Sequence, residues 1–379
     1  MARSPLSQGL NDNQQQGAKG SLNRLHIDWP LMTGLIALSI FGLIILYSAS
    51  GENWSTVSRQ MIWMCIAFVV MFFVAQIPPY QIQFWTPWVF GLGLLLLLAV
   101  LFFGEMGKGA QRWLDLGLFR VQPSELMKFA VPMMVAWYMA EKSLPPSFPR
   151  ILMALVIIAV PVALIAKQPD LGTSLLVGSA GIFVLLLTGL SWWLIGGFGL
   201  ILAAAAPVVW FFYMHDYQRQ RVLTFLNPES DPLGSGYHII QSKIAIGSGG
   251  IYGKGWLNGT QSQLDFLPER KTDFIFAVFS EEFGLIGVCC LLLLYAYIVF
   301  RGLTIAYQAQ STYARLVAGS LVLTFMVYIF VNIGMVTGIL PVVGVPLPLV
   351  SYGGTSMVTL MLAFGLLMSF HTHRKLITS

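Results

Sequence analysis

Two features of this largely apolar chain combine residue types that could do chemistry. The first is the pair Glu125 and Lys128, three positions apart in a run that begins Gln122-Pro-Ser. The second is Asp273, which ends a long polar segment and directly follows the run Arg270-Lys-Thr. A carboxylate close to cations can act as a general base on an anionic substrate. Both features therefore raise the question of which helices hold them.

The pair Glu125 and Lys128 has two interpretations. Spacing i,i+3 puts the two side chains on one face of a helix, and Pro123 suits the first turn of that helix, which Gln122 or Ser124 could cap. An isolated charge in the bilayer costs several kcal/mol, so the pair is expected to face the protein interior. It is either an ion pair that joins two helices or a polar wall of a substrate cavity.

Asp273 also has two interpretations. It could be an N-cap or first-turn carboxylate that complements the dipole of the following helix. Alternatively, it is a general base at the mouth of a membrane cavity. Glu281 and Glu282 follow in the same helix and point in different directions, so at most one of them could share a cavity with Asp273.

Several further cations are candidates for binding an anionic group. Arg112 offers a fork of donors that suits phosphate, although it could equally anchor the chain at the interface together with Trp113. Lys167 precedes Asp170, and Asp170 is well placed to cap the next helix. The polar segment supplies four more candidates, namely Arg219, Arg221, Lys243 and Lys254. A divalent metal, Mg or Mn, held by phosphate oxygens is an alternative source of positive charge.

Several familiar motifs are absent or incomplete. The run Gly247-Ser-Gly-Gly-Ile-Tyr-Gly-Lys-Gly255 resembles a phosphate loop, but Walker A chemistry needs glycine at 248 and Ser or Thr at 255. We expect its glycines to permit tight turns against the membrane surface. No His-Glu-x-x-His or Gly-x-Ser-x-Gly pattern occurs, so neither a zinc site nor a serine hydrolase is predicted. The three cysteines fall inside apolar runs and imply no disulfide framework.

The elements that position these residues are predicted to be membrane-spanning helices. The chain is 56% hydrophobic and 10% charged, which indicates an integral membrane protein. A bilayer core of about 30 Å needs roughly 20 apolar residues per helix. Ten runs fit, giving an all-α polytopic domain: 31–50, 59–77, 82–103, 123–140, 150–166, 171–189, 192–213, 273–300, 313–337 and 352–370.

The remaining segments are a tail and one large loop. Residues 1–28 are polar, without a cleavable signal pattern, and are predicted to form a disordered cytoplasmic tail before a membrane domain at 29–379. The stretch from Met214 to Asp273 holds 12 of the 37 charged residues, so residues 214–272 form a polar loop. The net charge of +5 is interleaved with apolar runs and gives no basis for nucleic-acid binding.

The distribution of Lys and Arg predicts the orientation. Ten spans put both termini on one side, where nine Lys and Arg lie, against five in the short connections of the other side. This bias favours cytoplasmic termini. The six cations of the long loop would reverse the count, but a loop near ~60 residues contributes weakly to the rule. The loop is therefore expected on the outer face.

The order of several motifs resembles the SEDS family (shape, elongation, division and sporulation). The segment from Asn332 to Ser356, with Gly338, Pro341, Gly344 and the Ser351-Tyr-Gly-Gly-Thr-Ser run, is similar to the signature of that family. Other runs similar to its rod-shape members are 108–115, 122–128, 168–174, 216–221, 231–238 and 266–276. The resemblance extends from about Asp28 to Lys375.

The resemblance implies a peptidoglycan glycosyltransferase that polymerises lipid II on the outer face of the cytoplasmic membrane, for lateral wall elongation and rod shape. It implies that Asp273 is the catalytic aspartate and that Glu125 and Lys128 line the central cavity. It also implies partners: a class B penicillin-binding protein transpeptidase and other membrane proteins of the elongation machinery.

In the mechanism that we hypothesise from this resemblance, Asp273 takes the proton from the 4-hydroxyl of the acceptor sugar. The oxygen of that hydroxyl then attacks C1 of the donor sugar. Undecaprenyl diphosphate leaves, and the β-1,4 bond forms with inversion. The diphosphate charge needs a cation, drawn from Arg112, Lys128, Arg219, Arg221, Lys243 and Lys254, with Lys167 also available. Two alternatives stay open: a lipid II flippase, which an intramembrane ion pair and interrupted helices would suit, and a scaffold for cell-wall enzymes.

Overall fold

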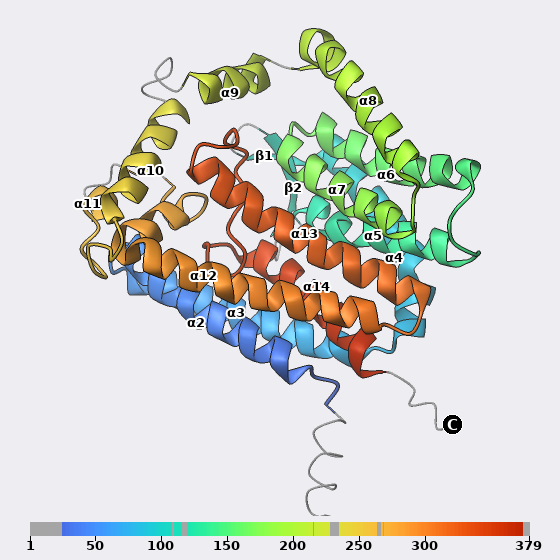
Figure 1. The fold of residues 1–379 in the computed structure, drawn as a ribbon, viewed down its shortest axis with the longest axis horizontal. Coiled ribbons are helices and arrows are strands. Elements are labelled where there is room, and N and C mark those ends of the chain that lie inside the picture. The colour runs from blue at the N-terminus through green and yellow to red at the C-terminus, as the bar shows by residue number, and fades with distance from the viewer. Residues whose placement is uncertain are drawn as a thin grey trace, which may run out of the picture.

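The computed structural model describes residues 25–107, 110–115, 120–214, 216–227, 235–263, 267 and 269–373. Helices lie at each of the ten predicted runs (Figure 1): α2 (Trp29–Ala49), α3 (Trp54–Gln76), α4 (Pro79–Phe103), α5 (Pro123–Ala140), α6 (Phe148–Lys167), α7 (Leu171–Leu187), α8 (Trp192–Val208), α12 (Ile275–Gln308), α13 (Thr312–Val336) and α14 (Gly354–Thr372). The helical membrane class is therefore confirmed.

Not all ten of these helices have the length and composition of a membrane span. In the described part of the chain, seven helices are long and apolar enough to cross a bilayer: α2, α3, α4, α6, α12, α13 and α14. Helix α7 is apolar but shorter. The count of ten spans stays a prediction.

Local sequence signals start the helices as expected. The Asp170 side chain caps α7 by accepting a hydrogen bond from the Thr173 backbone N–H at 3.2 Å, as predicted. Pro123 occupies the first turn of α5, where its missing N–H leaves no donor unpaired. Of the predicted tail 1–28, residues 1–24 lie outside the described residues, and Asp28 caps α2 through the Leu31 N–H at 2.9 Å.

A small antiparallel sheet in the connection between α4 and α5 departs from the all-α prediction. Its strands are β1 (Glu105–Gly107), β2 (Ala110–Asp115) and β3 (Arg120–Val121), in the order β1-β2-β3. Three strands this short carry too few residues for an alternating pattern to stand out, so the sequence predicted only a connection. The sheet presents Arg112 beside the start of α7.

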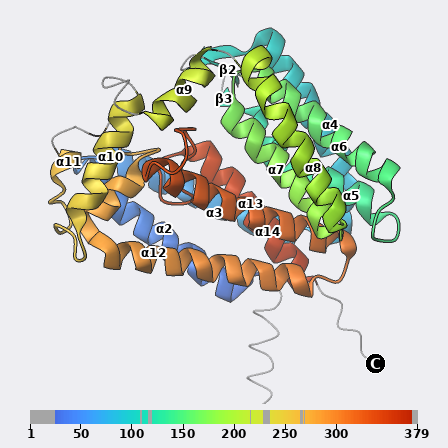
Figure 2. The same ribbon diagram turned by 45° about the horizontal axis from the view of Figure 1, so that its top comes forward.

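Helix α13 lies at the centre of the bundle. It packs against α5 and α7 on one side and against α12 and α14 on the other (Figures 1 and 2). The paired helices α4–α5 and α6–α7 form one group, and α2, α3, α12 and α14 form the other. Between these groups, α13 can present polar side chains to α5 and to the chain that precedes α14.

The predicted outer loop 214–272 is partly helical. It contains α9 (Asp216–Leu226), α10 (Ser235–Gly249) and the short α11 (Thr260–Gln263). Helix α8 continues into the π-helical turn η1 (Val209–Tyr213), and α10 packs against α12. Figure 2 draws α9, α10 and α11 together beyond one end of the bundle.

The segment Gly249–Gly255, here called the glycine strap, crosses a break in α12. Gly284 interrupts α12 with φ +62°, and an interrupted helix leaves backbone groups unpaired. The strap pairs them: N–H groups of Lys254 and Gly255 donate to carbonyls 281 and 282, and carbonyls 250 and 251 accept from N–H groups 285 and 286, all at 3.0–3.2 Å. Three of these glycines have the positive φ of tight turns, as predicted, and the strap they form bridges a broken helix. Their location at the membrane surface stays a prediction.

Candidate functional site

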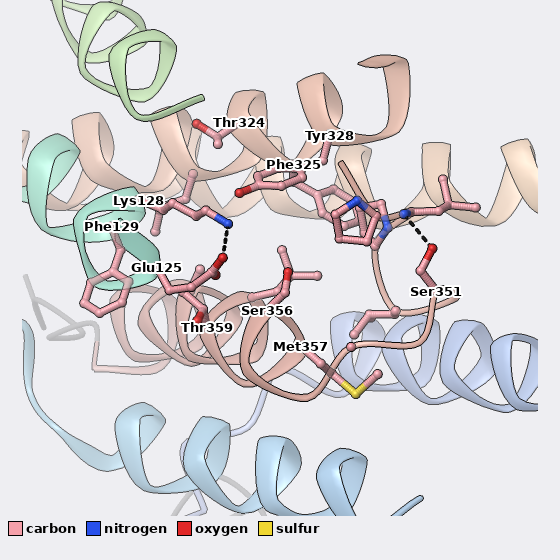
Figure 3. Close-up of a pocket in the computed structure, with 18 residues that line it drawn as sticks. Glu125, Lys128, Phe129, Thr324, Phe325, Tyr328, Ser351, Ser356, Met357 and Thr359 are labelled. Atoms are coloured by element: carbon pink, nitrogen blue, oxygen red, sulfur yellow. Dashed lines mark hydrogen bonds and ion pairs between the residues drawn. The ribbon is translucent and has the colours of Figure 1, made fainter. Parts of the chain in front are cut away.

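A pocket that is partly open to the outside lies between α5, α13, α14 and the segment that precedes α14 (Figure 3). Its walls are mostly apolar, with hydroxyls from Thr324, Ser356 and Thr359 and one charged pair. The charged pair comes from α5, and the segment Pro346–Leu349 contributes further lining residues. A mostly apolar pocket with a few polar groups suits an amphipathic ligand.

Glu125 and Lys128 form the charged pair, with 2.5 Å between Lys128 Nζ and Glu125 Oε1 (Figure 3). Their side chains are 13% and 12% exposed, so solvent screens them little. Lys128 Nζ also lies 5.2 Å from the ring centroid of Tyr328 on α13. The predicted pairing is confirmed, and the pair both contacts a second helix and lines a pocket.

Asp273 lies just before α12. Phe274 occupies the N-cap position and the helix begins at Ile275, so the interpretation of Asp273 as an N-cap or first-turn carboxylate is wrong. Asp273 is half-buried. Its carbonyl accepts a hydrogen bond from Asn332 Nδ2 at 3.0 Å, and the same amide group donates to the Val345 carbonyl at 2.7 Å.

These contacts relate Asp273 to the pocket. Tyr328 lines the pocket, and Asn332 is four residues further along α13, about 6 Å along the same helical face. On the opposite wall, Val345 directly precedes Pro346, which also lines the pocket. Asp273 is not itself a lining residue. Its main chain is joined through Asn332 to Val345, which directly precedes the pocket-lining Pro346.

Three of the predicted diphosphate-binding cations are engaged inside the protein. Arg112 donates to the Pro169 carbonyl at 3.1 Å and lies 3.4 Å from Asp170. Arg219 donates to the carbonyls of 210 and 211 at 2.9 and 3.0 Å, at the end of η1. Lys254 forms an ion pair with Glu281 at 2.7 Å.

Two other predicted cations, Lys167 and Lys243, do not line the pocket. Lys167 is exposed at the end of α6. Lys243 is exposed on α10, with its side-chain end against Gly338. The side chain of Arg221 lies outside the described residues. Lys128 is therefore the one predicted cation that lines the described pocket.

Glu281 and Glu282 do not line the pocket either. Glu281 is fully buried and accepts from Lys254, Thr260 Oγ1 at 3.0 Å and the Gln261 N–H at 3.1 Å. Glu282 is also buried and accepts from the hydroxyl of Ser48 on α2. These carboxylates fasten the loop after the glycine strap, and helix α2, to α12.

Sequence reasoning missed Tyr328, Asn332 and Ser351 as site residues. A signal was available for two of them: Thr324, Tyr328 and Asn332 recur every four residues within an apolar span, which indicates a polar stripe facing the protein interior. No comparable local signal marks Ser351. In the described part of the chain, no three His, Cys, Asp or Glu side chains lie together as metal ligands.

A central helix with a polar stripe, a charged pair inside a largely apolar pocket and seven described helices long enough to cross a bilayer define a polytopic membrane protein whose pocket suits an amphipathic ligand. The family model described as the FtsW, RodA and SpoVE cell cycle protein family matches residues 29–376. The chain belongs to this family, the one that the sequence motifs resembled.

Sequence similarity to known relatives extends over most of this chain. The chain is 56% identical to the peptidoglycan glycosyltransferase MrdB of Escherichia coli K12, covering 97% of this chain and 99% of MrdB. It is 35% identical to the stage V sporulation protein E of Bacillus subtilis, covering 88% and 94% of the two chains.

Solved structures share the fold. One, described as the structural coordination of polymerization and crosslinking by a peptidoglycan synthase complex, matches with a TM-score of 0.79 at 29% identity over 92% of this chain and 99% of the other. The rod-shape-determining protein RodA of Thermus thermophilus matches with a TM-score of 0.69 at 26% identity over 92% and 98%.

Proposed function

We propose that this chain is a peptidoglycan glycosyltransferase. The observation that carries the proposal is its 56% identity to MrdB of Escherichia coli, which bears that name, over nearly the whole of both chains. The substrate that fits is lipid II, as donor and as acceptor. Its lipid tail would suit apolar walls such as those of the pocket, and its diphosphate would suit a buried cation.

Asp273 is the proposed general base. It takes the proton from the 4-hydroxyl of the acceptor sugar, and that oxygen attacks C1 of the donor sugar while undecaprenyl diphosphate leaves. Because a diphosphate is a good leaving group, one carboxylate suffices, whereas glycoside hydrolysis commonly uses two. Asp273 is half-buried, and its main chain is bonded to Asn332, which also bonds the Val345 carbonyl beside the pocket; these contacts support this role.

Lys128 is the proposed partner of the diphosphate. Arg112, Arg219 and Lys254 bind protein groups away from the pocket and do not line it. Lys128 lies in the pocket wall, and its carboxylate partner Glu125 would hold it in place before substrate arrives. A positioned cation stabilises negative charge as it develops on the leaving group.

The proposed setting is the cytoplasmic membrane, with both termini in the cytoplasm and the loop 214–272 outside. Asp28 at the start of α2 lies 3.0 Å from His371 at the end of α14, so both ends of the membrane domain meet on one side. An even number of spans would produce this arrangement, and the ten proposed spans meet that condition. The likeness to a peptidoglycan synthase complex supports a crosslinking partner, proposed to be a class B penicillin-binding protein.

One assay separates the glycosyltransferase from a flippase and from a scaffold. The protein, alone and with its partner, is reconstituted into vesicles containing labelled lipid II, and both glycan polymer and transbilayer movement of label are measured. We expect polymer, with inverted configuration at the new bond. Label movement without polymer would instead identify a flippase, and neither activity in the presence of the partner would favour a scaffold.

A further inference from the structure

The segment Lys271-Thr-Asp273 is held by three donors from the C-terminal signature. The Tyr352 N–H donates to the carbonyl of Lys271 at 2.9 Å. The Ser351 hydroxyl donates to the carbonyl of Thr272 at 2.6 Å. Asn332 Nδ2 donates to the carbonyl of Asp273 at 3.0 Å. Three successive carbonyls thus each accept one bond from a segment at least 59 residues away in sequence.

The side chains of Asn332 and Ser351 each make a second hydrogen bond, and these bonds tie the segment 271–273 to the pocket wall. Asn332 also donates to the carbonyl of Val345 at 2.7 Å, next to pocket-lining Pro346. Ser351 also accepts from the Leu347 N–H at 2.8 Å (Figure 3). Asn332 and Ser351 therefore each bond both to the segment 271–273 and to the pocket wall.

The pocket wall formed by residues 345–353 is bonded to three helices, namely α13 through Asn332, α3 and α12. Gln60 of α3 donates to the Ser351 carbonyl at 3.2 Å and accepts from the Gly353 N–H at 3.3 Å. Tyr295 of α12 donates to the Pro348 carbonyl at 2.7 Å. Asn332, Tyr295 and Gln60 are at most 2% exposed. Non-helical backbone inside a membrane protein needs such partners.

The Asn332 side chain acts in this structure as a hydrogen-bond donor. Its Nδ2 bonds two carbonyls, whereas its Oδ1 is buried and finds no hydrogen-bond partner in the described part of the chain. Burying an acceptor unpaired is unfavourable, so the amide is oriented by the carbonyls of Asp273 and Val345. An aspartate or a leucine of similar size could not make either bond.

We propose that Asn332 and Ser351 are positioning residues for Asp273: they set its place relative to the pocket without themselves taking part in proton transfer. This inference rests on the proposed role of Asp273 as general base. A displacement of about 1 Å at a reacting group can reduce a rate on the order of 10²-fold. Loss of either side chain should therefore lower kcat while substrate binding in the pocket persists.

The test compares Ser351→Ala and Asn332→Leu with a matched control, Ser320→Ala. Ser320 of α13 is fully buried and donates to the Ala180 carbonyl at 2.6 Å, the same length as the Ser351 bond, but it joins α13 to α7. Lipid II polymerisation is measured over a range of lipid II concentrations, in the complex with the partner. Amide hydrogen exchange is followed in peptides covering residues 271–277.

We expect Ser351→Ala and Asn332→Leu to lose kcat by about 10- to 100-fold with KM changed less than about threefold. Exchange at residues 271–277 should quicken in both, while Ser320→Ala keeps the parental kcat and exchange. Ser351→Thr restores the hydroxyl and should recover most of the rate. Because Ser351 also lines the pocket, a raised KM with unchanged kcat would assign it to substrate binding and overturn the proposal.

Two other results would also overturn it. One is a parental kcat in both variants. The other is failure of both to accumulate as folded protein, since the bonds would then hold the fold rather than Asp273. Asp273→Asn, measured in parallel, keeps the two proposals apart. If that variant is active, the general-base role fails; if it is inactive while Ser351→Ala and Asn332→Leu are fully active, only the positioning role fails.

Discussion

At the scale of single residues, Glu125 and Lys128 could either lock two helices or face a ligand, and charge reversal separates these roles. Glu125→Lys combined with Lys128→Glu keeps opposite charges at i,i+3 but exchanges their places in the pocket wall. We expect the double variant to fold and to lose at least about 10²-fold in polymerisation, because the cation no longer meets the leaving group. Thermal unfolding and lipid II turnover check this.

The single variant Glu125→Gln provides the reference for that experiment. Glu125→Gln leaves Lys128 charged in a pocket where it is only 12% exposed, and removing one partner of a buried pair costs about 3–5 kcal/mol. The unfolding midpoint should therefore fall in the single variant and recover in the double. A double variant with parental polymerisation would mean that the pair serves the fold alone.

Sequence separation decided which residue contacts could be predicted. The pair Glu125–Lys128 and the Asp170 cap are each made across three residues, and both were predicted correctly. The bonds of Arg112 to Pro169, Lys254 to Glu281 and Asn332 to Asp273 span 57, 27 and 59 residues. A single sequence carries no signal for such partners, so the sequence left Arg112 and Lys254 among the candidates for binding a diphosphate.

At the scale of elements, the glycine strap makes a specific prediction about stability. A Cβ at Gly253 would lie 2.1 Å from the Glu282 carbonyl oxygen, and its φ is +77°. Gly253→Ala should therefore destabilise the protein by at least about 2 kcal/mol, from backbone strain and from a clash with backbone that cannot move away. The loss is measured as a lower thermal unfolding midpoint in detergent.

Gly189→Ala is the matched control. Its φ is +84°, and a Cβ there would meet nothing within 4 Å. This variant carries the strain of a left-handed alanine without the clash, so its midpoint should fall less than that of Gly253→Ala. Equal losses in the two variants would show that close approach of the strap to the break in α12 contributes nothing measurable.

Hydropathy found the long helices because each one needs an apolar run of the right length. It could not find the break at Gly284, since the apolar pattern continues across it from Phe283 to Leu285. It also read residues 214–272 as a loop, although α10 lies there. Helix α10 is short and mixed in polarity, and it is stabilised by packing against α12 rather than by its own pattern.

At the scale of the whole molecule, the two ends of the membrane domain are clasped together. Asp28 forms an ion pair with Arg301 of α12 at 2.5 Å and contacts His371 of α14. Burial opposes ionisation of Asp28, but hydrogen bonds from His371 and Arg301 outweigh it and hold its pKa well below its usual range. The carboxylate thus stays charged near neutral pH, and the clasp is lost only under strongly acidic conditions.

A second contact in the clasp should respond to milder acid. The rings of His26 and His373 stack with centroids 3.8 Å apart. Burial, followed by the charge of His26, lowers the pKa of His373 from its usual 6.5. Between the lowered pKa and 6.5 the unfolded chain binds more protons than the folded one, so stability falls as pH drops through that window and is unaffected above it.

We therefore expect the unfolding midpoint to fall between pH 7 and the lowered pKa, and to fall less in His373→Gln. Asp28→Asn is the contrasting variant. It should lower the midpoint by a similar amount at every pH in this range, because the Asp28 carboxylate does not titrate there. Identical pH dependence in parent and His373→Gln would contradict the assigned effect of the ring stack.

The central claim is that Asp273 is the general base of a glycosyltransferase, and one rate measurement tests it most directly. Purified complex with Asp273→Asn is compared with parent and with Glu52→Gln, an equivalent change at an exposed carboxylate between α2 and α3. The account predicts that Asp273→Asn polymerises lipid II about 10²–10⁴-fold more slowly, with an unchanged unfolding midpoint and unchanged partner binding, while Glu52→Gln keeps the parental rate. Near-parental polymerisation by Asp273→Asn would contradict it.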